Sequence, residues 1–371
     1  SFKISKNILI LKDFTFKHGG NIYLHAKENN IPVSKIIDSS ASIVPFKPPK
    51  FLIKALHSEI KNGNYRYYPD KSFHDLREII GEFHNTNPDW ILPGNGAAEL
   101  ITWVGLEASK IGKNCLPIPS FVDYERSLNC WNAEYFFSNL PKEWPESNPQ
   151  AFPINKQSDV LWITNPHNPT GQLWSRKSLV DALNKYKLVI CDEAFLSLTP
   201  NGEDESLIPL VEAYENLIVI RSLTKLFSIA GIRLGYLVSS SKKLELINKN
   251  RDPWPLNCFA IKAGKTLLKN KINYENWTKK IHNWIQTERQ WFFNELSKNN
   301  KLKVHFTSTN FFLIESQTSL SPNINYLASK GILIRECSSF RSLNENWARI
   351  SIQTHQKNKI VANEIHKSFL N

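Results

Sequence analysis

The segment from Arg221 to Gly235 carries residue types that could do chemistry. It reads Arg221-Ser-Leu-Thr-Lys225-Leu-Phe-Ser-Ile-Ala-Gly-Ile-Arg233-Leu-Gly235 and follows an apolar run. A lysine condenses with a carbonyl only as a neutral amine, and nearby hydroxyls and guanidiniums can bind a phosphate dianion. The segment could therefore hold a phosphorylated aldehyde as a Schiff base on Lys225. The alternative is a strand followed by a basic surface loop, because lysines and arginines usually face solvent.

Three apolar runs in the middle of the chain are predicted to be buried strands, at 159–164, 187–191 and 216–221. Amphipathic stretches at 176–186 and 207–214 separate them, so strand and helix alternate as in an α/β fold with a mostly parallel central sheet between helices. In such a sheet the polar residues that end each strand meet at one edge, where ligands bind. Those residues are Asn165-Pro-His-Asn168-Pro-Thr-Gly171, Asp192-Glu193-Ala-Phe195 and Ser222 to Lys225.

Two shorter motifs precede these strands. Gly94-Asn-Gly96-Ala97 is predicted to be a glycine-rich turn that opens a helix, and free amides at a helix N-terminus favour an anion. With Ser222 and Arg233 it would form a phosphate cup, whereas the plainer interpretation is an ordinary strand-to-helix turn. Phe121 follows a strand candidate at 115–118, where it could stack on a planar ring, although a phenylalanine more often packs in a core.

The composition and charge are typical of a globular protein and limit the kinds of partner that we expect. The 371 residues are 41% hydrophobic and 12% aromatic, enough for a large core. The chain lacks a membrane-length apolar run and a secretory signal at its start, so we expect a cytoplasmic protein with no membrane partner. The five cysteines form no Cys-x-x-Cys pair, which argues against disulfides or a zinc site. The charge of +12 comes largely from dispersed lysines, so we expect small anions rather than nucleic acid as partners; the alternative is that the excess charge serves no specific partner.

A second, smaller domain is predicted from the C-terminal part of the chain. Two prolines within 251–255 break the preceding helix and mark a linker. Helical patterns at 258–268 and 274–296 then lead into several short strand candidates, which indicates an α+β domain. The expected division is a large domain at 46–252 and a small domain formed by 1–45 and 253–371.

Together, these motifs resemble the fold-type-I pyridoxal-phosphate enzymes of the class I/II aminotransferase family. The family's order and approximate spacing are kept by Gly94-Asn-Gly96, Asn165 to Gly171, Asp192-Glu-Ala, Ser222-Leu-Thr-Lys225 and Arg233-Leu-Gly235. The resemblance covers nearly all of the chain. It implies a PLP-dependent transferase fold of type I and pyridoxal 5'-phosphate as the cofactor.

The same resemblance implies roles for individual residues. Lys225 would form the Schiff base, and Asp192 would pair with the pyridine nitrogen and keep it protonated. Asn168 would hydrogen-bond the phenolic oxygen of the ring, and Phe121 would stack on it. Arg349 would bind the substrate α-carboxylate. The cofactor phosphate would be held by Gly96, Ala97, Ser222 and Arg233.

Within the family, four segments resemble the decarboxylases of L-threonine O-3-phosphate in cobalamin synthesis, which are themselves similar to histidinol-phosphate aminotransferases. They are His18-Gly-Gly-Asn21, Asp192-Glu-Ala-Phe195, Pro253-Trp-Pro-Leu-Asn257 and Ile332-Leu-Ile-Arg335-Glu-Cys337. Many aminotransferases have a tyrosine in place of Phe195. Two positions depart from the decarboxylase pattern, because Ser42 replaces an expected asparagine and Phe340-Arg-Ser342 replaces Tyr-Pro-Gly.

The substrate contacts and the assembly are expectations of this resemblance as well. A small phosphorylated amino acid would be bound by His18, Asn168, Arg335 and Arg349, and Tyr67 or Tyr68 would reach the partner's site in a homodimer. For His18, an ordinary surface or core position is the alternative. The alternative functions are an aminotransferase acting on histidinol phosphate or another amino acid, and a basic nucleic-acid-binding protein. Which reaction occurs depends on which bond at the substrate Cα stands perpendicular to the ring.

Overall fold

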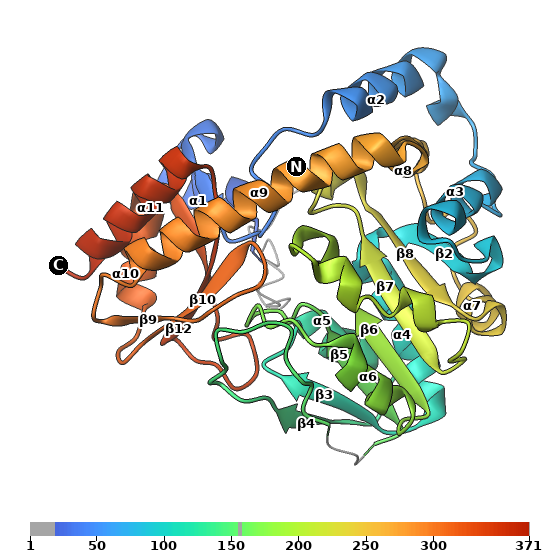
Figure 1. Ribbon diagram of the computed structural model, residues 1–371. Coiled ribbons are helices and arrows are strands. Elements are labelled where there is room, and N and C mark those ends of the chain that lie inside the picture. The colour runs from blue at the N-terminus through green and yellow to red at the C-terminus, as the bar shows by residue number, and fades with distance from the viewer. Residues whose placement is uncertain (1–18, 155–157, 371) are drawn as a thin grey trace, which may run out of the picture.

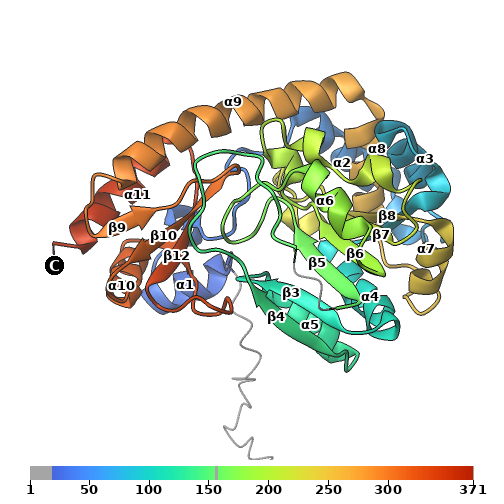
Figure 2. The ribbon, with the colours of Figure 1, turned by 60° about the horizontal axis from the view of Figure 1, so that its bottom comes forward.

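The structure is a computed structural model that describes residues 19–154 and 158–370. Within these residues the chain forms two β-sheets, on which helices pack (Figure 1). A long helix runs past both sheets (Figure 2). His18, for which a substrate role was predicted, lies outside the described residues.

The larger sheet has seven strands in the order β2-β8-β7-β6-β5-β3-β4. Neighbouring strands are parallel except where β8 (Leu234–Ser239) pairs with β2 (Ile91–Asn95) and β7 (Leu217–Ser222). The remaining strands are β3 (Asn114–Ile118), β4 (Tyr135–Asn139), β5 (Val160–Thr164) and β6 (Leu188–Asp192). The predicted α/β class and mostly parallel sheet are confirmed, and the residues after β5, β6 and β7 meet at one edge.

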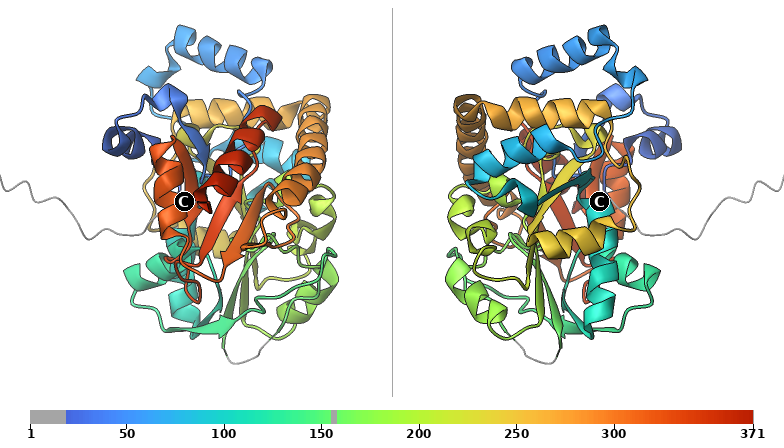
Figure 3. Two further views of the ribbon diagram at one scale, coloured as in Figure 1. Left: turned by 90° about the vertical axis from the view of Figure 1, so that its left-hand side faces the viewer. Right: turned by 90° about the vertical axis from the view of Figure 1, so that its right-hand side faces the viewer.

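Helices cover both faces of this sheet because alternate strand residues point to opposite sides. On one face, Ile190 and Ile218 share a core with residues of α4 (Gly96–Ile111), α5 (Val122–Cys130) and α7 (Ser241–Asn248). On the other face, Val189 and Val219 share a larger core with residues of four helices and the first half of α9. The four are α2 (Lys50–Asn62), α3 (His74–His84), α6 (Arg176–Leu183) and α8 (Cys258–Lys269). α2 lies across the top of the molecule, next to α8 (Figure 3).

The smaller sheet has five strands in the order β1-β11-β12-β10-β9. Its strands are β1 (Ile37–Ser39), β9 (Leu302–Val304), β10 (Phe311–Ser316), β11 (Ile332–Glu336) and β12 (Trp347–Ser351). Only β1 and β11 pair in parallel; the other pairs within this described sheet are antiparallel. One face packs Phe312 and Ile350 against α9 (Lys271–Leu296), α10 (Ser321–Ser329) and α11 (His355–Ser368), and α1 (Ile22–Asn29) precedes β1.

The long helix α9 contributes to the cores of both sheets. In the middle of the helix, Ile281 and Ile285 are buried in the core of the larger sheet; nearer its C-terminal end, Phe292 and Leu296 are buried in the core of the smaller sheet. The helix α8 also follows residue 252 and packs on α2 and α3. Residues after 252 therefore contribute to the cores of both sheets. The predicted division into domains at residue 252 stays a prediction.

The predicted strands and helices largely match the observed ones, with one exception. Each of the three central strands begins and ends within one residue of its predicted limits. The helix predicted at 207–214 is instead a single 3-10 turn at Ile208–Leu210, and the following amides of Val211 and Ala213 also bond three residues back, to Ile208 and Leu210. Among the helices of the described ranges, none combines the length and the apolar character that crossing a bilayer requires.

Candidate active site

A cavity of about 360 Å³ lies between the carboxyl edge of the larger sheet and the smaller sheet. Its walls come from the ends of β5, β6 and β7, the start of α4 and α5, and β12. The predicted site residues that line it are Ala97, Phe121, Asn168, Asp192, Ser222, Lys225, Arg233 and Arg349. The structure therefore brings together predicted residues as far apart in the sequence as Ala97 and Arg349.

Asp192 ends β6 as a buried carboxylate with two hydrogen bonds. The hydroxyl of Tyr124 donates to its Oδ2 at 2.7 Å, and the backbone amide of Ala194 donates to its Oδ1 at 2.9 Å. Burial raises the pKa of Asp192, while the Tyr124 hydrogen bond and the positive charge of Lys225 oppose that rise. These contacts favour the ionised form of a carboxylate that burial would otherwise neutralise.

Lys225 lies three residues after the end of β7 and is half-buried at the cavity. Burial lowers its pKa from 10.5, the ordinary value, to about 8; Asp192 opposes this change, whereas Arg233 and Arg349 add to it. Its Nζ lies 4.7 Å from the centre of the Phe195 ring. With such a pKa, about a tenth of the amine is neutral at pH 7, and the neutral amine is the form that attacks a carbonyl.

The start of α4, Arg233 and two hydroxyls form an anion-binding corner. Gly96 begins α4 with a φ of 73°, and a Cβ at that position would lie 2.3 Å from Nη2 of Arg233. Only glycine therefore lets the guanidinium approach the helix start. No described side chain caps α4, so its first amides can bind a ligand. The hydroxyls of Ser222 and Thr224 lie 2.8 Å apart beside this corner, and together these groups suit a phosphate dianion.

The glycine that ends the motif after Arg233, Gly235, is required by close packing. It lies on β8 against the first turn of α4, and a Cβ there would lie 2.8 Å from both the amide nitrogen of Ala97 and the carbonyl oxygen of Arg221. A side chain would therefore push α4 away from β7 and β8. The absence of one keeps the helix start within reach of the same anion as Ser222 and Arg233.

Arg349 reaches the cavity from β12 of the smaller sheet. Its Nη1 donates to Oδ1 of Asn168 at 2.5 Å, and its Nη2 donates to the carbonyl oxygen of Ser40 at 2.8 Å. Its Nε has no hydrogen-bond partner among the described residues. Burial lowers the pKa of Arg349 to about 10, which still leaves it cationic at neutral pH. Since both hydrogen-bond partners are neutral oxygens, the guanidinium keeps its charge available for an anionic ligand.

The other residues with predicted substrate roles lie elsewhere. Arg335 is paired with Arg349 in the β11–β12 register, donates to Oγ of Ser339 at 2.8 Å, and is not one of the described residues lining the cavity. Tyr67 and Tyr68 are 68% and 79% exposed and line a separate cleft of about 1180 Å³ beside α2, α3 and α8. The roles of these three side chains and of His18 stay predictions.

Tyr124 and Ser40 line the cavity without having been assigned a role from the sequence. Tyr124 lies three residues after Phe121, so the start of α5 places both on one side of the helix. That spacing is a signal that could have identified it. Ser40 acts through its backbone carbonyl, which leaves no signal in the residue type.

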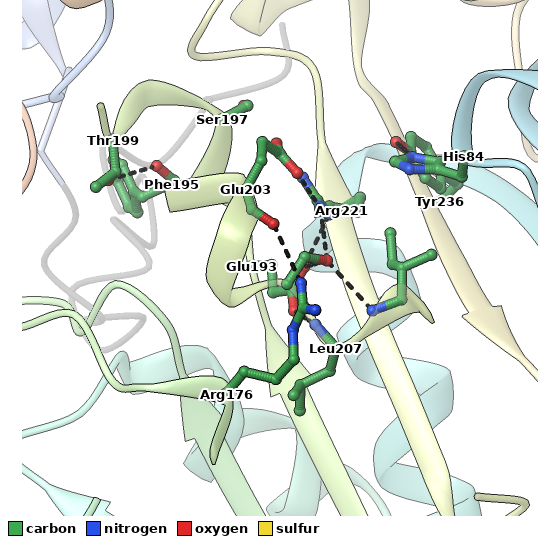
Figure 4. Close-up of polar contacts among 12 residues, drawn as sticks. His84, Arg176, Glu193, Phe195, Ser197, Thr199, Glu203, Leu207, Arg221 and Tyr236 are labelled. Carbon is green, nitrogen blue, oxygen red and sulfur yellow. Dashed lines mark hydrogen bonds and ion pairs between the residues drawn. The ribbon is translucent and has the colours of Figure 1, made fainter. Parts of the chain in front are cut away.

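Arg221 lies next to Ser222 in β7 but points away from the cavity, into a cluster of polar residues (Figure 4). Its Nε lies 3.0 Å from Glu193, and its two Nη atoms donate to the Glu203 carboxylate at 2.8 and 2.7 Å. Burial alone would lower the pKa of Arg221, but the two carboxylates raise it well above its usual range. The sequence pattern offered both Arg221 and Arg233 for a phosphate; the structure corrects this, because the charge of Arg221 is already paired.

Residues 34–365 match the family of class I and II aminotransferases. A protein of Caldanaerobacter subterraneus subsp. tengcongensis, named provisionally as a threonine-phosphate decarboxylase, is 31% identical over 356 residues, covering 92% of this chain and 91% of that protein. The threonine-phosphate decarboxylase of Salmonella typhimurium is 28% identical over 353 residues, covering 93% and 94%. A histidinol-phosphate aminotransferase of the same Caldanaerobacter is 28% identical over 343 residues, covering 91% and 94%.

Solved structures show the same fold. The histidinol-phosphate aminotransferase of Clostridium acetobutylicum superposes with a TM-score of 0.77 at 28% identity, covering 88% of this chain and 97% of that one. The histidinol-phosphate aminotransferase of Sinorhizobium meliloti, in complex with pyridoxal 5'-phosphate, gives 0.78 at 18% identity and covers 99% and 98%. The chain is thus about equally similar to decarboxylases and to aminotransferases.

Proposed function

The chain belongs to the class I and II aminotransferase family of pyridoxal-phosphate enzymes, and from this premise we propose that it decarboxylates L-threonine O-3-phosphate. The product would be (R)-1-amino-2-propanol phosphate, for corrinoid synthesis. The fold type, the membership of the class I and II family of pyridoxal-phosphate enzymes and the cofactor that the sequence predicted are confirmed by the family match and the solved relatives. The substrate and the bond that breaks are the proposal.

The charge of the cavity suits pyridoxal 5'-phosphate. Among its described lining residues, Lys225, Arg233 and Arg349 are cationic, whereas Asp192 is the one acidic side chain. This excess of positive charge suits a ligand with a phosphate and a second anion. When bound, the cofactor supplies an aldehyde that bonds reversibly to amines and a ring that withdraws electrons from the bonds at Cα.

We assign the cofactor contacts as the sequence predicted them. The anion-binding corner of Gly96, Ala97, Ser222 and Arg233 would take the phosphate. Asp192 would take the ring nitrogen, Asn168 the phenolic oxygen and Phe121 a face of the ring. Lys225 would hold the aldehyde carbon. Each of these side chains lines or adjoins the same cavity, which supports the assignment.

The substrate would be positioned and protonated by the remaining groups. Arg349 would bind an anionic group of the substrate through the N–H groups that its two neutral partners leave free. In the proposed reaction the bond from Cα to the carboxylate breaks and carbon dioxide leaves. The ammonium group of Lys225 then supplies the proton that takes the place of the carboxylate on Cα.

Phe195 is the observation that carries the choice of decarboxylation. Its ring lies 4.7 Å from Nζ of Lys225 and 5.2 Å, edge to face, from the ring of Phe311. A tyrosine at this position, as in many aminotransferases, would bring a hydroxyl to the site. Phenylalanine matches the decarboxylases that the sequence resembles and leaves an apolar wall beside Lys225.

Transamination of histidinol phosphate or another amino acid is the second candidate. It is favoured by the 28% identity to histidinol-phosphate aminotransferases over almost the whole chain. The same side chains would serve it, but Lys225 would remove the Cα proton instead of supplying one.

Product analysis separates the two reactions. The protein would be incubated with pyridoxal phosphate and threonine phosphate, and carbon dioxide and aminopropanol phosphate would be measured. A parallel incubation with histidinol phosphate and 2-oxoglutarate would be assayed for glutamate. We expect carbon dioxide in the first and no glutamate in the second; glutamate without carbon dioxide would reject decarboxylation. The Lys225→Ala variant should give neither product.

We also propose a homodimer in which Tyr67 or Tyr68 reaches the partner's site. The exposure of these rings and of Ile272, 70% exposed beside them in the same cleft, supports an interface at this surface. Mixing Tyr68→Ala and Lys225→Ala subunits tests it. If Tyr68 serves the partner's site, the mixture should regain activity that neither variant has; failure to regain activity would remove Tyr68 from the proposal.

A further inference from the structure

We infer that Tyr124 is a positioning residue for the reaction, because its hydroxyl holds the Asp192 carboxylate ionised and oriented toward the ring nitrogen of the cofactor. The inference rests on the proposed site, in which Asp192 pairs with that nitrogen. It adds a residue that acts through Asp192 rather than on the substrate.

The hydroxyl of Tyr124 has two partners and one proton. It lies 2.7 Å from Oδ2 of Asp192 and 2.9 Å from Oγ1 of Thr164. An ionised carboxylate only accepts hydrogen bonds, so the proton of Tyr124 must point to Asp192. Thr164 then donates its own proton to the tyrosine oxygen. The result is a directed chain from the end of β5, through α5, to the end of β6.

Packing fixes this chain in place. Tyr124 is 1% exposed, and its ring centre lies 5.3 Å from that of Trp162 and 5.7 Å from that of Phe121, edge to face. Phe121, the residue proposed to stack on the cofactor, precedes α5, and Tyr124 lies in the first turn of the same helix. The start of α5 therefore sets both the stacking ring and the hydroxyl that contacts Asp192.

The hydrogen bond should change the chemistry of the cofactor nitrogen. A carboxylate that accepts a second hydrogen bond is a weaker base, so it leaves a shared proton on the pyridine. A protonated ring withdraws electrons more strongly than a neutral one. In Tyr124→Phe, Asp192 would keep the Ala194 amide and lose the hydroxyl, and the proton would shift from the ring toward the carboxylate.

Affinities for two cofactors isolate this effect. The full-length chain would be stripped of cofactor and titrated with pyridoxal phosphate and with its 1-deaza analogue, in which carbon replaces the pyridine nitrogen. The variants are Tyr124→Phe, Asp192→Asn and a matched control, Tyr135→Phe. Tyr135 also contacts a carboxylate, at 3.3 Å from Glu125, but lies on β4 outside the described cavity lining.

We expect Tyr124→Phe to weaken pyridoxal phosphate binding roughly tenfold, because Asp192 would no longer be held ionised and oriented toward the ring nitrogen. Its affinity for the deaza analogue should stay within about twofold of the unaltered chain, and Tyr135→Phe should change neither. Equal losses for both cofactors, or no loss, would overturn the inference. Thr164→Val, which removes only the donor to Tyr124, should show a smaller loss with the same selectivity, and it replaces Tyr124→Phe if that variant fails to fold.

The Asp192→Asn variant distinguishes a failure of the proposed cofactor site from a failure of the proposed role of Tyr124. If it weakens pyridoxal phosphate but not the analogue, the proposed contact of Asp192 with the nitrogen holds, and Tyr124 is judged by its own variants. If it weakens both equally or neither, the proposed site itself fails, and the role of Tyr124 fails with it.

Discussion

Two buried arginines, one behind strand β7 and one at the cavity, differ in how their charge is compensated. On the side away from the cavity, Arg221 pairs with Glu193 and Glu203, and its pKa is raised well above its usual range despite burial. At the cavity, Arg349 is as deeply buried, 6% against 4% exposed, but its hydrogen-bond partners among the described residues are neutral oxygens, and burial lowers its pKa to about 10. The chain supplies the counter-ion of one arginine, and a ligand would supply that of the other.

This difference separates stability from function. Removing one member of a buried ion pair leaves an uncompensated charge, which is costly. Removing a buried cation that has no counter-ion relieves a cost and takes away a binding site instead. The two arginines should therefore respond to the same substitution in different measurements.

The largest effect is expected for Arg221→Met. The Glu193 carboxylate, fully buried at 0% side-chain exposure, would lose its cation, and the free energy of unfolding should fall by about 3–5 kcal/mol. Urea unfolding of the cofactor-free chain measures it. The control is Arg341→Met, which breaks the pair of a 57% exposed arginine with Glu125 and should cost less than about 1 kcal/mol. Similar losses in both variants would erase the comparison.

Arg349→Met should show the reverse pattern. We expect the free energy of unfolding of the cofactor-free chain to change by less than about 1 kcal/mol, because the lost partners are neutral. The affinity for an anionic substrate should fall by about 2–3 kcal/mol, or roughly 30- to 150-fold, as KM or a direct titration would show. A destabilisation as large as that of Arg221→Met would mean that Arg349 is structural.

Glu203→Gln should have a smaller effect than Arg221→Met. The Glu203 side chain is 46% exposed, so water screens its pair with Arg221, and glutamine can still accept one hydrogen bond. We expect a loss of about 1 kcal/mol in the free energy of unfolding. A loss near that of Arg221→Met would place the main counter-ion of Arg221 at Glu203 rather than at Glu193.

The pH dependence of cofactor capture should be the most subtle effect. Since burial lowers the pKa of Lys225 to about 8, the neutral amine increases roughly tenfold per pH unit below pH 8 and levels off above it. The rate at which the cofactor-free chain captures pyridoxal phosphate, followed by absorbance, should do the same. Arg349→Met removes a neighbouring cation and should move the plateau to higher pH, whereas Arg341→Met should leave it in place.

The location of the site, at the carboxyl edge of the larger sheet, could be predicted because each central strand is short, apolar and followed by polar residues. This pattern places Asp192, Asn168 and Lys225 at a common location. It could not separate Arg221 from Arg233, because that depends on which face of β7 Arg221 takes and on Glu203, which lies in a separate turn at Gly202–Glu205. Nor could it show Ser40, which contributes only a carbonyl oxygen.

The helix α9 has a mechanical consequence for the whole molecule. Its 26 residues extend for about 39 Å as one continuous strut. The strut anchors Ile281 and Ile285 beside the sheet that bears Lys225, and Phe292 and Leu296 beside the sheet that bears Arg349. Trp284, in the middle of the helix, packs against both cores and joins the two anchored ends. If the chain were divided at residue 252, Lys225 and α9 would lie on separate pieces, and the helix would no longer link the sheet near Lys225 to the sheet that bears Arg349.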